Sequence, residues 1–154
     1  MTRRAASAGA LLATLLGCTS IDPGPNYVVS DTQFDPDFFY CHVEPQYIFQ
    51  FKCGPGDASD NNNCHFNASA VTGMVLQNHA PVNCNGGDHP VDLSMLGNGS
   101  PAVANYTAAS FEMSTDYTTA PIWVRPNNNV HPRDVVMMNK AAAQLLATWA
   151  AKSQ

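Results

Sequence analysis

The clearest pattern of apolar positions lies near the end of the chain, in residues 139–152. Its apolar side chains recur every three or four residues, and they are Ala142, Leu145, Leu146 and Trp149. This spacing places them on one face of a helix, and the many alanines favour a helix further. We therefore predict a final amphipathic helix whose apolar face packs against the rest of the protein.

A second helix is predicted over about residues 101–113. Ser100 is a suitable N-cap, and Pro101 is favourable in the first turn of a helix. The stripe that we expect to be buried consists of Val103, Tyr106 or Thr107, Ser110 or Phe111, and Met113. Between this helix and the last one, the apolar run at residues 122–124 is also expected to be buried.

Two shorter helical segments are predicted near the start of the domain. Asp35 is a suitable N-cap with a proline after it, so a short helix is expected over residues 35–43. The pair Glu44-Pro45 should interrupt this helix and start another, because a residue before proline avoids helical backbone. The second segment would run into Cys53.

The middle of the chain, residues 67–99, lacks a helical period. It is rich in Asn, Gly and Pro, which are typical of turns and loops. Residues 71–76 contain apolar positions that suit a brief strand or a buried loop, and Cys84 lies in a predicted turn. The predicted fold is therefore mostly α, a small helical domain with long irregular loops.

The start of the chain resembles a bacterial secretory leader. Arg3 and Arg4 precede an apolar run that is too short to span a bilayer. The run ends in LLGC, which resembles the lipobox that directs lipidation of its cysteine, here Cys18. Acyl chains on Cys18 would anchor the protein to a membrane face. The alternative is an ordinary signal peptide cut near Ala13.

The lipobox resemblance sets the expected domain plan and location. Residues 1–17 would be the leader, residues 18–33 the lipidated cysteine and a flexible tether, and residues 34–154 the folded domain. Thr19 directly follows Cys18. The absence of an aspartate at this position fits the usual sorting of such lipoproteins to the outer membrane. We expect a cell-envelope protein that faces the periplasm or the exterior and touches the membrane through its lipid anchor only.

The charge balance limits the possible partners. Removing the two leader arginines from the seven basic residues leaves five against twelve acidic ones, a net charge of −7. Nucleic acid is therefore not an expected partner, because phosphate binding needs clustered Lys and Arg. Docking to a basic protein surface is compatible with this charge, and it would be weak and sensitive to salt.

Four cysteines remain after Cys18, namely Cys41, Cys53, Cys64 and Cys84. An even number in an exported chain suggests full pairing, for which three connectivities exist. A disulfide between Cys53 and Cys64 would close a short loop and contribute about 3 kcal/mol on the chain-entropy model.

Cys53 and Cys64 also suit a different chemistry, because His65 follows the second of them. A c-type haem is attached through two cysteine sulfurs, and the histidine after the second cysteine is the proximal iron ligand, usually as C-x-x-C-H. Here residues 54–63 separate the cysteines, and their Gly, Pro, Asn and Asp content favours an outward bulge. Lengthening the loop from two to ten residues costs only about 1.4 kcal/mol.

The surroundings of this motif resemble the small single-haem cytochromes c of bacteria. The segment VEPQYIFQFKC resembles the short helix that leads into the haem cysteines of that family. The segment APIWVRPNNNVHPRD and the final helix resemble the region that supplies the distal ligand. The resemblance covers about residues 38–152 and implies a cytochrome c-like fold, with Trp149 packed against the first helix. The expanded cysteine spacing is its chief departure from the family.

The resemblance also implies the roles of individual residues. One haem c would be attached to Cys53 and Cys64, with His65 as its proximal ligand. His131, which precedes a proline before the last helix, would be the distal ligand, and a bis-histidine haem has a lower potential than a His/Met one. Cys41 and Cys84 would then form a disulfide. Other candidates for the distal ligand are Met74, Met95, Met113, His79 and His89.

The implied function is one-electron transfer to a redox partner protein in the envelope, not the transformation of a substrate. No G-x-S-x-G motif is present, which argues against a hydrolase of that type. The alternative is a haem-free, disulfide-stabilised lipoprotein of the same fold with a binding or structural role. A zinc or copper site is less favoured, because its candidate ligands match no tight spacing, and they are Cys64, His65, His79, Cys84 and His89.

Overall fold

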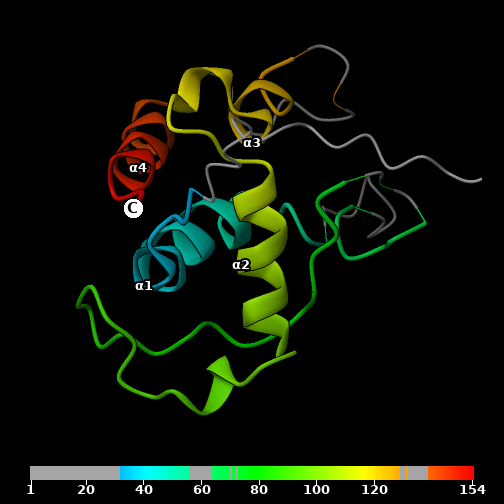
Figure 1. Ribbon diagram of the computed structural model, residues 1–154. Coiled ribbons are helices and arrows are strands. Elements are labelled where there is room, and N and C mark those ends of the chain that lie inside the picture. The colour runs from blue at the N-terminus through cyan, green and yellow to red at the C-terminus, as the bar shows by residue number, and fades with distance from the viewer. Residues whose placement is uncertain (1–31, 56–63, 70, 72, 129–130, 132–138) are drawn as a thin grey trace, which may run out of the picture. The chain divides into compact units, whose positions relative to one another are not determined.

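The computed structural model contains helices joined by irregular segments, with no strand among the residues that it describes (Figure 1). These are residues 32–55, 64–69, 71, 73–128, 131 and 139–154. The prediction of a mostly helical domain with long loops is confirmed for this part of the chain. The predicted leader, Cys18 and nearly all of the tether lie outside the described residues. No described helix is long and apolar enough to cross a membrane.

The first helical segment is continuous, although the sequence predicts a break in it. Helix α1 (Pro36–Phe38) begins after Asp35, whose side chain accepts a hydrogen bond from the Phe38 amide at 3.1 Å. It continues as the π-helix η1 (Phe39–Phe49), which contains Pro45. In an α-helix the ring of Pro45 would collide with the carbonyl four residues earlier, and the wider π turn removes this conflict. The predicted interruption at Glu44-Pro45 is therefore wrong.

Helix α2 (Pro101–Phe111) begins at the predicted place but buries a different face. The Ser100 side chain caps the helix by accepting a hydrogen bond from the Val103 amide. The buried residues of the helix are Ala102, Asn105 and Ala109, while Phe111 is 82% exposed. Small side chains let α2 approach η1 closely. Of the predicted stripe, Met113 is buried and Tyr106 packs against the core, whereas Phe111 was wrongly included as an alternative.

The final helix, α4 (Lys140–Ala151), matches its prediction. Asn139 caps it by accepting hydrogen bonds from two backbone amides. Trp149 is fully buried, and its ring centroid lies 5.3 Å from that of Phe39 in η1. The Trp149 indole also donates a hydrogen bond of 2.9 Å to the Asp35 carbonyl. The last helix thus packs on the first helical segment.

Short helical turns complete the described chain. They are η3 (Ser94–Leu96), η4 (Tyr117–Thr119) and α3 (Pro121–Val124). Of the apolar run predicted to be buried, Ile122 is 3% exposed but Val124 is 39% exposed. Ile122 anchors α3 to the core.

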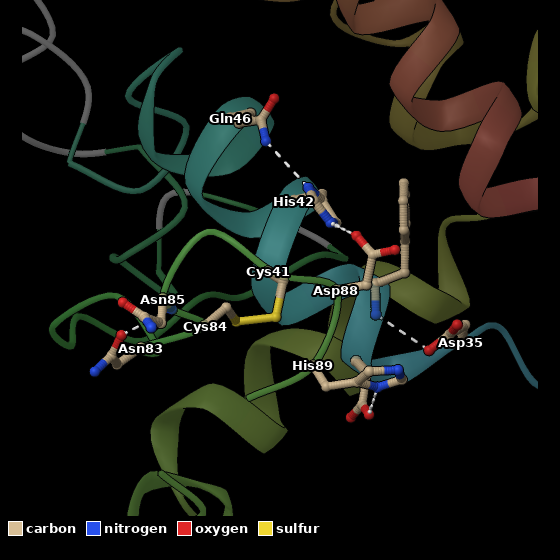
Figure 2. The surroundings of a disulfide bond; sticks show 11 residues. Asp35, Cys41, His42, Gln46, Asn83, Cys84, Asn85, Asp88 and His89 are labelled. Atoms are coloured by element: carbon tan, nitrogen blue, oxygen red, sulfur yellow. Dashed lines mark hydrogen bonds and ion pairs between the residues drawn. A yellow bond between two sulfur atoms is a disulfide. The ribbon is translucent and has the colours of Figure 1, made fainter. Parts of the chain in front are cut away.

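A disulfide fastens the long middle loop to η1. It joins Cys41 to Cys84, whose Cα atoms lie 5.6 Å apart, and it is the bridge that the sequence analysis favoured (Figure 2). The turn after it is tight, since Asn85 and Gly86 have positive φ angles of 48° and 75°. The Gly87 amide donates to the Cys84 carbonyl at 2.8 Å and closes this turn.

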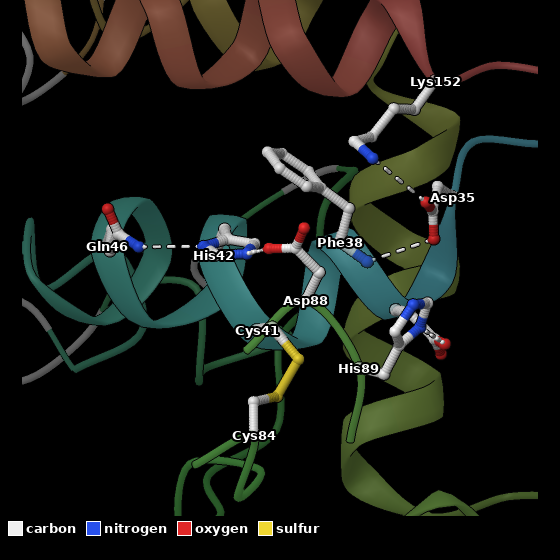
Figure 3. A network of polar contacts seen from close by, with 10 residues as sticks. Asp35, Phe38, Cys41, His42, Gln46, Cys84, Asp88, His89 and Lys152 are labelled. Atoms are coloured by element: carbon white, nitrogen blue, oxygen red, sulfur yellow. Dashed lines mark hydrogen bonds and ion pairs between the residues drawn. A yellow bond between two sulfur atoms is a disulfide. The ribbon is translucent and has the colours of Figure 1, made fainter. Parts of the chain in front are cut away.

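Histidine–carboxylate contacts surround the bridge and fasten the same loop (Figure 3). His42 of η1 contacts Asp88 at 2.7 Å, and His89 contacts Asp37 of α1 at 2.8 Å. The hydrogen bond to Asp37 raises the pKa of His89 above its ordinary value. These contacts are exposed, so they add little to stability beside the disulfide.

Leu146→Ala tests the packing of α4. Leu146 is fully buried, so the substitution should lower the free energy of unfolding by about 2–5 kcal/mol. The matched control is Leu93→Ala, since Leu93 is 69% exposed and the change should be within about 0.5 kcal/mol. Equal losses for the two variants in urea unfolding would contradict the described core.

Removal of the disulfide by Cys41→Ala with Cys84→Ala should be more costly than removal of a neighbouring contact. The bridge closes a loop with a sequence separation of 43 residues. The chain-entropy model then gives a loss of about 4 kcal/mol, whereas Asp88→Asn should cost at most about 1 kcal/mol. Thermal unfolding under matched conditions compares them, and a double alanine variant as stable as Asp88→Asn would contradict this view.

Candidate functional site

The two motif cysteines and His65 lie at the base of one loop. The His65 amide donates to the Cys53 carbonyl at 3.0 Å, and the Phe66 amide donates to the Gly54 carbonyl at 2.9 Å. These two backbone hydrogen bonds bring Cys64 and His65 back to Cys53, although residues 56–63 between them are not described. The expanded spacing in the sequence therefore does not separate the residues of the motif in space.

Cys53 and Cys64 are both thiols, in contrast to the bridged Cys41 and Cys84. Cys53 is 7% exposed, and its sulfur lies 3.9 Å from the Tyr47 carbonyl, to which the thiol donates. Cys64 is half-buried. Two thiols of this kind, held at the base of one loop, can each form a covalent bond to a carbon atom of a ligand.

The ring of His65 is oriented by the backbone of residues 74–76. Its Nδ1 lies 2.5 Å from the Met74 carbonyl, and the Leu76 amide donates to the His65 carbonyl at 2.8 Å. A carbonyl only accepts hydrogen bonds, so Nδ1 must carry the proton and Nε2 carries the lone pair of the neutral ring. Metal-binding histidines are commonly oriented in this way.

The electrostatic surroundings of His65 favour its neutral form. Burial lowers the pKa of His65 below its ordinary value, and nearby His131 lowers it further, while the hydrogen bond to Met74 opposes both effects. A neutral imidazole is the form that can donate its lone pair to a metal.

The imidazole ring of His131 lies near that of His65, and the two rings are stacked. The ring centroids are 6.3 Å apart and the ring planes differ by 12°. The His131 amide donates to the Asn128 carbonyl at 2.9 Å, so the turn after α3 carries this histidine. The structure thus brings His65 close to Cys53 and to His131, and Cys64 precedes His65 in the chain.

Tyr47 connects the segment that leads to Cys53 with the segment that leads to His131, a role that was not predicted from the sequence. Its side chain is fully buried, and its hydroxyl donates a 2.6 Å hydrogen bond to the Ile122 carbonyl. Burial raises the pKa of Tyr47 far above its ordinary value, so the hydroxyl stays protonated and remains a donor. The helix before Cys53 is thereby fixed to α3, the helix before His131. No sequence pattern identifies a tyrosine with this role.

An ion pair between Glu112 and Arg125 lies close to the segment that holds His65. Arg125 donates to Glu112 at 2.9 Å, and both side chains influence the pKa of His65. A side chain at Gly73 would meet this pair, since a Cβ there would lie 3.0 Å from the Glu112 carboxylate. Gly73 also has a φ of 124°, which only glycine adopts readily.

The alternative metal ligands are not brought together. Cys84 is in the disulfide, His79 contacts Glu44, and His89 contacts Asp37. The described residues contain no group of three His, Cys, Asp or Glu side chains that could hold a metal ion. Among the other distal candidates, Met74 and Met113 are buried in the core.

An open groove runs beside the turn that carries His131. It has a volume of about 370 Å³ and is lined by Thr118, Trp123, Val124, Asn127 and Asn128. The ring of Trp123 packs edge-on against Tyr117 at 5.7 Å, which fixes one wall.

Comparison of the chain with known protein families, with curated proteins and with solved structures finds no match. The functional conclusion therefore depends on the residues of the site.

Gly54→Ala tests the loop base. A Cβ at Gly54 would lie 2.3 Å from the ring of Phe66, so the ring must move and the free energy of unfolding should fall by about 1–3 kcal/mol. Gly97→Ala is the control, because nothing lies within 4 Å of a Cβ there. Adding Phe66→Ala should remove most of the penalty of Gly54→Ala in a double-mutant cycle. Similar unfolding curves for the two glycine variants would contradict the described contact.

Proposed function

We propose that the protein is a lipid-anchored electron carrier of the bacterial envelope. One c-type haem would be held through Cys53 and Cys64, with His65 and His131 as its iron ligands. The observation that carries this proposal is the parallel pair of imidazoles, one of which has its Nδ1 proton committed to the Met74 carbonyl. Because the Met74 carbonyl holds the Nδ1 proton, the Nε2 lone pair of His65 is available to a metal.

The donor set fits the proposed group. Two thiols supply the sulfurs for two thioether bonds, and the neutral ring of His65 supplies a lone pair at Nε2. Cys53 is nearly buried and His65 is half-buried, so water is partly excluded from both. Burial of this kind tunes a haem potential and protects the metal–ligand bonds.

The two histidines also lie close to one another, with ring centroids 6.3 Å apart. Each would contribute an imidazole nitrogen to the metal. A distal methionine is a weaker candidate, because Met74 and Met113 both pack in the core.

Each part of the chain has a defined task in this proposal. When bound, the haem supplies a one-electron iron couple. Cys53 and Cys64 fix the group covalently, and the Met74 carbonyl orients His65. The bond from Tyr47 to α3 maintains the spacing between the two histidine-bearing segments. Such a site transfers electrons without transforming a substrate, so we do not propose an enzyme.

The partner is proposed to be a redox protein of the envelope with a basic surface. The chain without its leader has a net charge of −7, which follows from five basic and twelve acidic residues. Opposite charge speeds encounter and gives the short-lived complexes suited to electron transfer. The proposed acyl chains on Cys18 would keep both proteins at one membrane face.

The proposal is tested with the exported protein, purified from a bacterial host that matures c-type cytochromes. It should be red, and its haem should resist acid–acetone extraction, because thioether bonds are covalent. The ferric protein should have a low-spin spectrum, which His65→Ala abolishes. His131→Met should keep the haem and raise the midpoint potential, since thioether ligation raises it.

The matched controls are His42→Ala and His89→Ala, two histidines that contact carboxylates on the loop surface. Both variants should keep the low-spin spectrum. A colourless exported protein whose Cys53 and Cys64 are joined in a disulfide would contradict the proposal and favour the haem-free lipoprotein.

A further inference from the structure

A second cluster of polar side chains is buried away from the cysteines. Glu44 and Asn105 are 0% exposed, and the side chain of His79 is 5% exposed. They come from η1, α2 and the extended segment that follows Leu76. One carboxylate oxygen of Glu44, Oε1, contacts both the Asn105 amide nitrogen and His79 Nε2 at 2.9 Å. We call these three residues the Glu44 cluster.

The side chain of Asn105 forms hydrogen bonds with both the backbone N–H and the backbone carbonyl of Gln77. The Gln77 amide donates to the Asn105 side-chain oxygen at 2.7 Å, and the Asn105 nitrogen donates to the Gln77 carbonyl at 3.0 Å. This pairing replaces a neighbouring strand, which the segment lacks among the described residues. An asparagine carries both a donor and an acceptor at its amide, so it suits this position.

The contacts of His79 define how many protons it shares with Glu44. His79 Nδ1 lies 2.7 Å from the Ala80 carbonyl and Nε2 faces Glu44, so both nitrogens face acceptors. One proton must therefore lie between His79 and Glu44, on either partner, and the pair has no net charge in either case. Burial raises the pKa of Glu44, while the hydrogen bonds from Asn105 and His79 oppose this shift.

The second oxygen of Glu44, Oε2, has no hydrogen-bond partner among the described residues. A buried polar group in this state is costly, and an apolar cluster of similar volume would be more stable. The presence of three buried polar residues in a helical core, at this cost, points to a role in specifying one arrangement of the chain.

The segment held by Asn105 is the segment that orients His65. Gln77 is three residues after Met74, whose carbonyl accepts from His65 Nδ1, and directly follows Leu76, whose amide donates to the His65 carbonyl. We propose that Asn105 and Glu44 are positioning residues for His65. They fix the register of residues 74–79 and thereby keep the Met74 carbonyl against Nδ1. The inference deepens the proposed function, since it concerns the histidine assigned there as proximal ligand.

Amide hydrogen exchange tests this inference on the purified, exported protein. In Asn105→Ala the Leu76 amide should exchange about tenfold faster or more. Local opening of residues 74–79 would then no longer have to break the two hydrogen bonds between Asn105 and Gln77, so it would cost less free energy. The control is Leu146→Ala, which weakens the core from α4 without touching this segment. The two variants are compared at matched free energy of unfolding. Equal protection of Leu76 in both would overturn the proposal.

A second variant keeps the test decisive if Asn105→Ala does not fold. Glu44→Gln retains the size of the side chain but removes the proton shared with His79. It should also speed exchange at Leu76, and unchanged exchange would overturn the proposal.

A second readout applies to the haem-bearing protein. Loss of the hydrogen bond to Nδ1 makes the imidazole less basic, so Asn105→Ala should raise the midpoint potential while Leu146→Ala leaves it unchanged. If the exported protein carries no haem, the proposed function fails, but the exchange measurement still decides whether Asn105 positions His65.

Discussion

The hydrogen bonds that hold His65 are the constraint on which the candidate site depends. Its amide donates to the Cys53 carbonyl, its carbonyl accepts from Leu76, and its ring donates to Met74. The first contact brings the ends of a long insert together, and the other two orient the imidazole. Without them the Cys-x10-Cys-His sequence would be only three residues at the ends of a loop. With them it becomes an arrangement of two thiols and one oriented ring.

The helical framework around this histidine explains why His131 lies near it. Tyr47 fixes η1 to α3 through the Ile122 carbonyl, and the turn after α3 carries His131. The disulfide between Cys41 and Cys84 fastens the long loop on η1. A small domain with few regular elements needs such discrete attachments, since its helices bury limited apolar area.

The sequence was sufficient to predict local features of the fold and the residues that share a motif. The caps at Asp35 and Ser100 and the final helix followed from side-chain chemistry and periodicity. The π-helix through Pro45 was not predictable, because tertiary packing outweighed the local preference of a residue before proline. The face that α2 buries, with Asn105 at its centre, was also missed, since a polar residue reads as exposed unless its partners are known.

The sequence names the candidate residues Cys53, Cys64, His65 and His131 by type and spacing, and their roles stay a prediction. It does not reveal the supporting contacts of Tyr47, of the Met74 carbonyl and of the Glu44 cluster, because these join residues far apart in the chain or use backbone groups. Peptide mapping by mass spectrometry of the exported protein tests the central claim most directly. We predict that the peptide or peptides containing Cys53 and Cys64 carry the added mass of one haem on both sulfurs. Unmodified thiols, or the loss of two hydrogens from a disulfide between them, would contradict it.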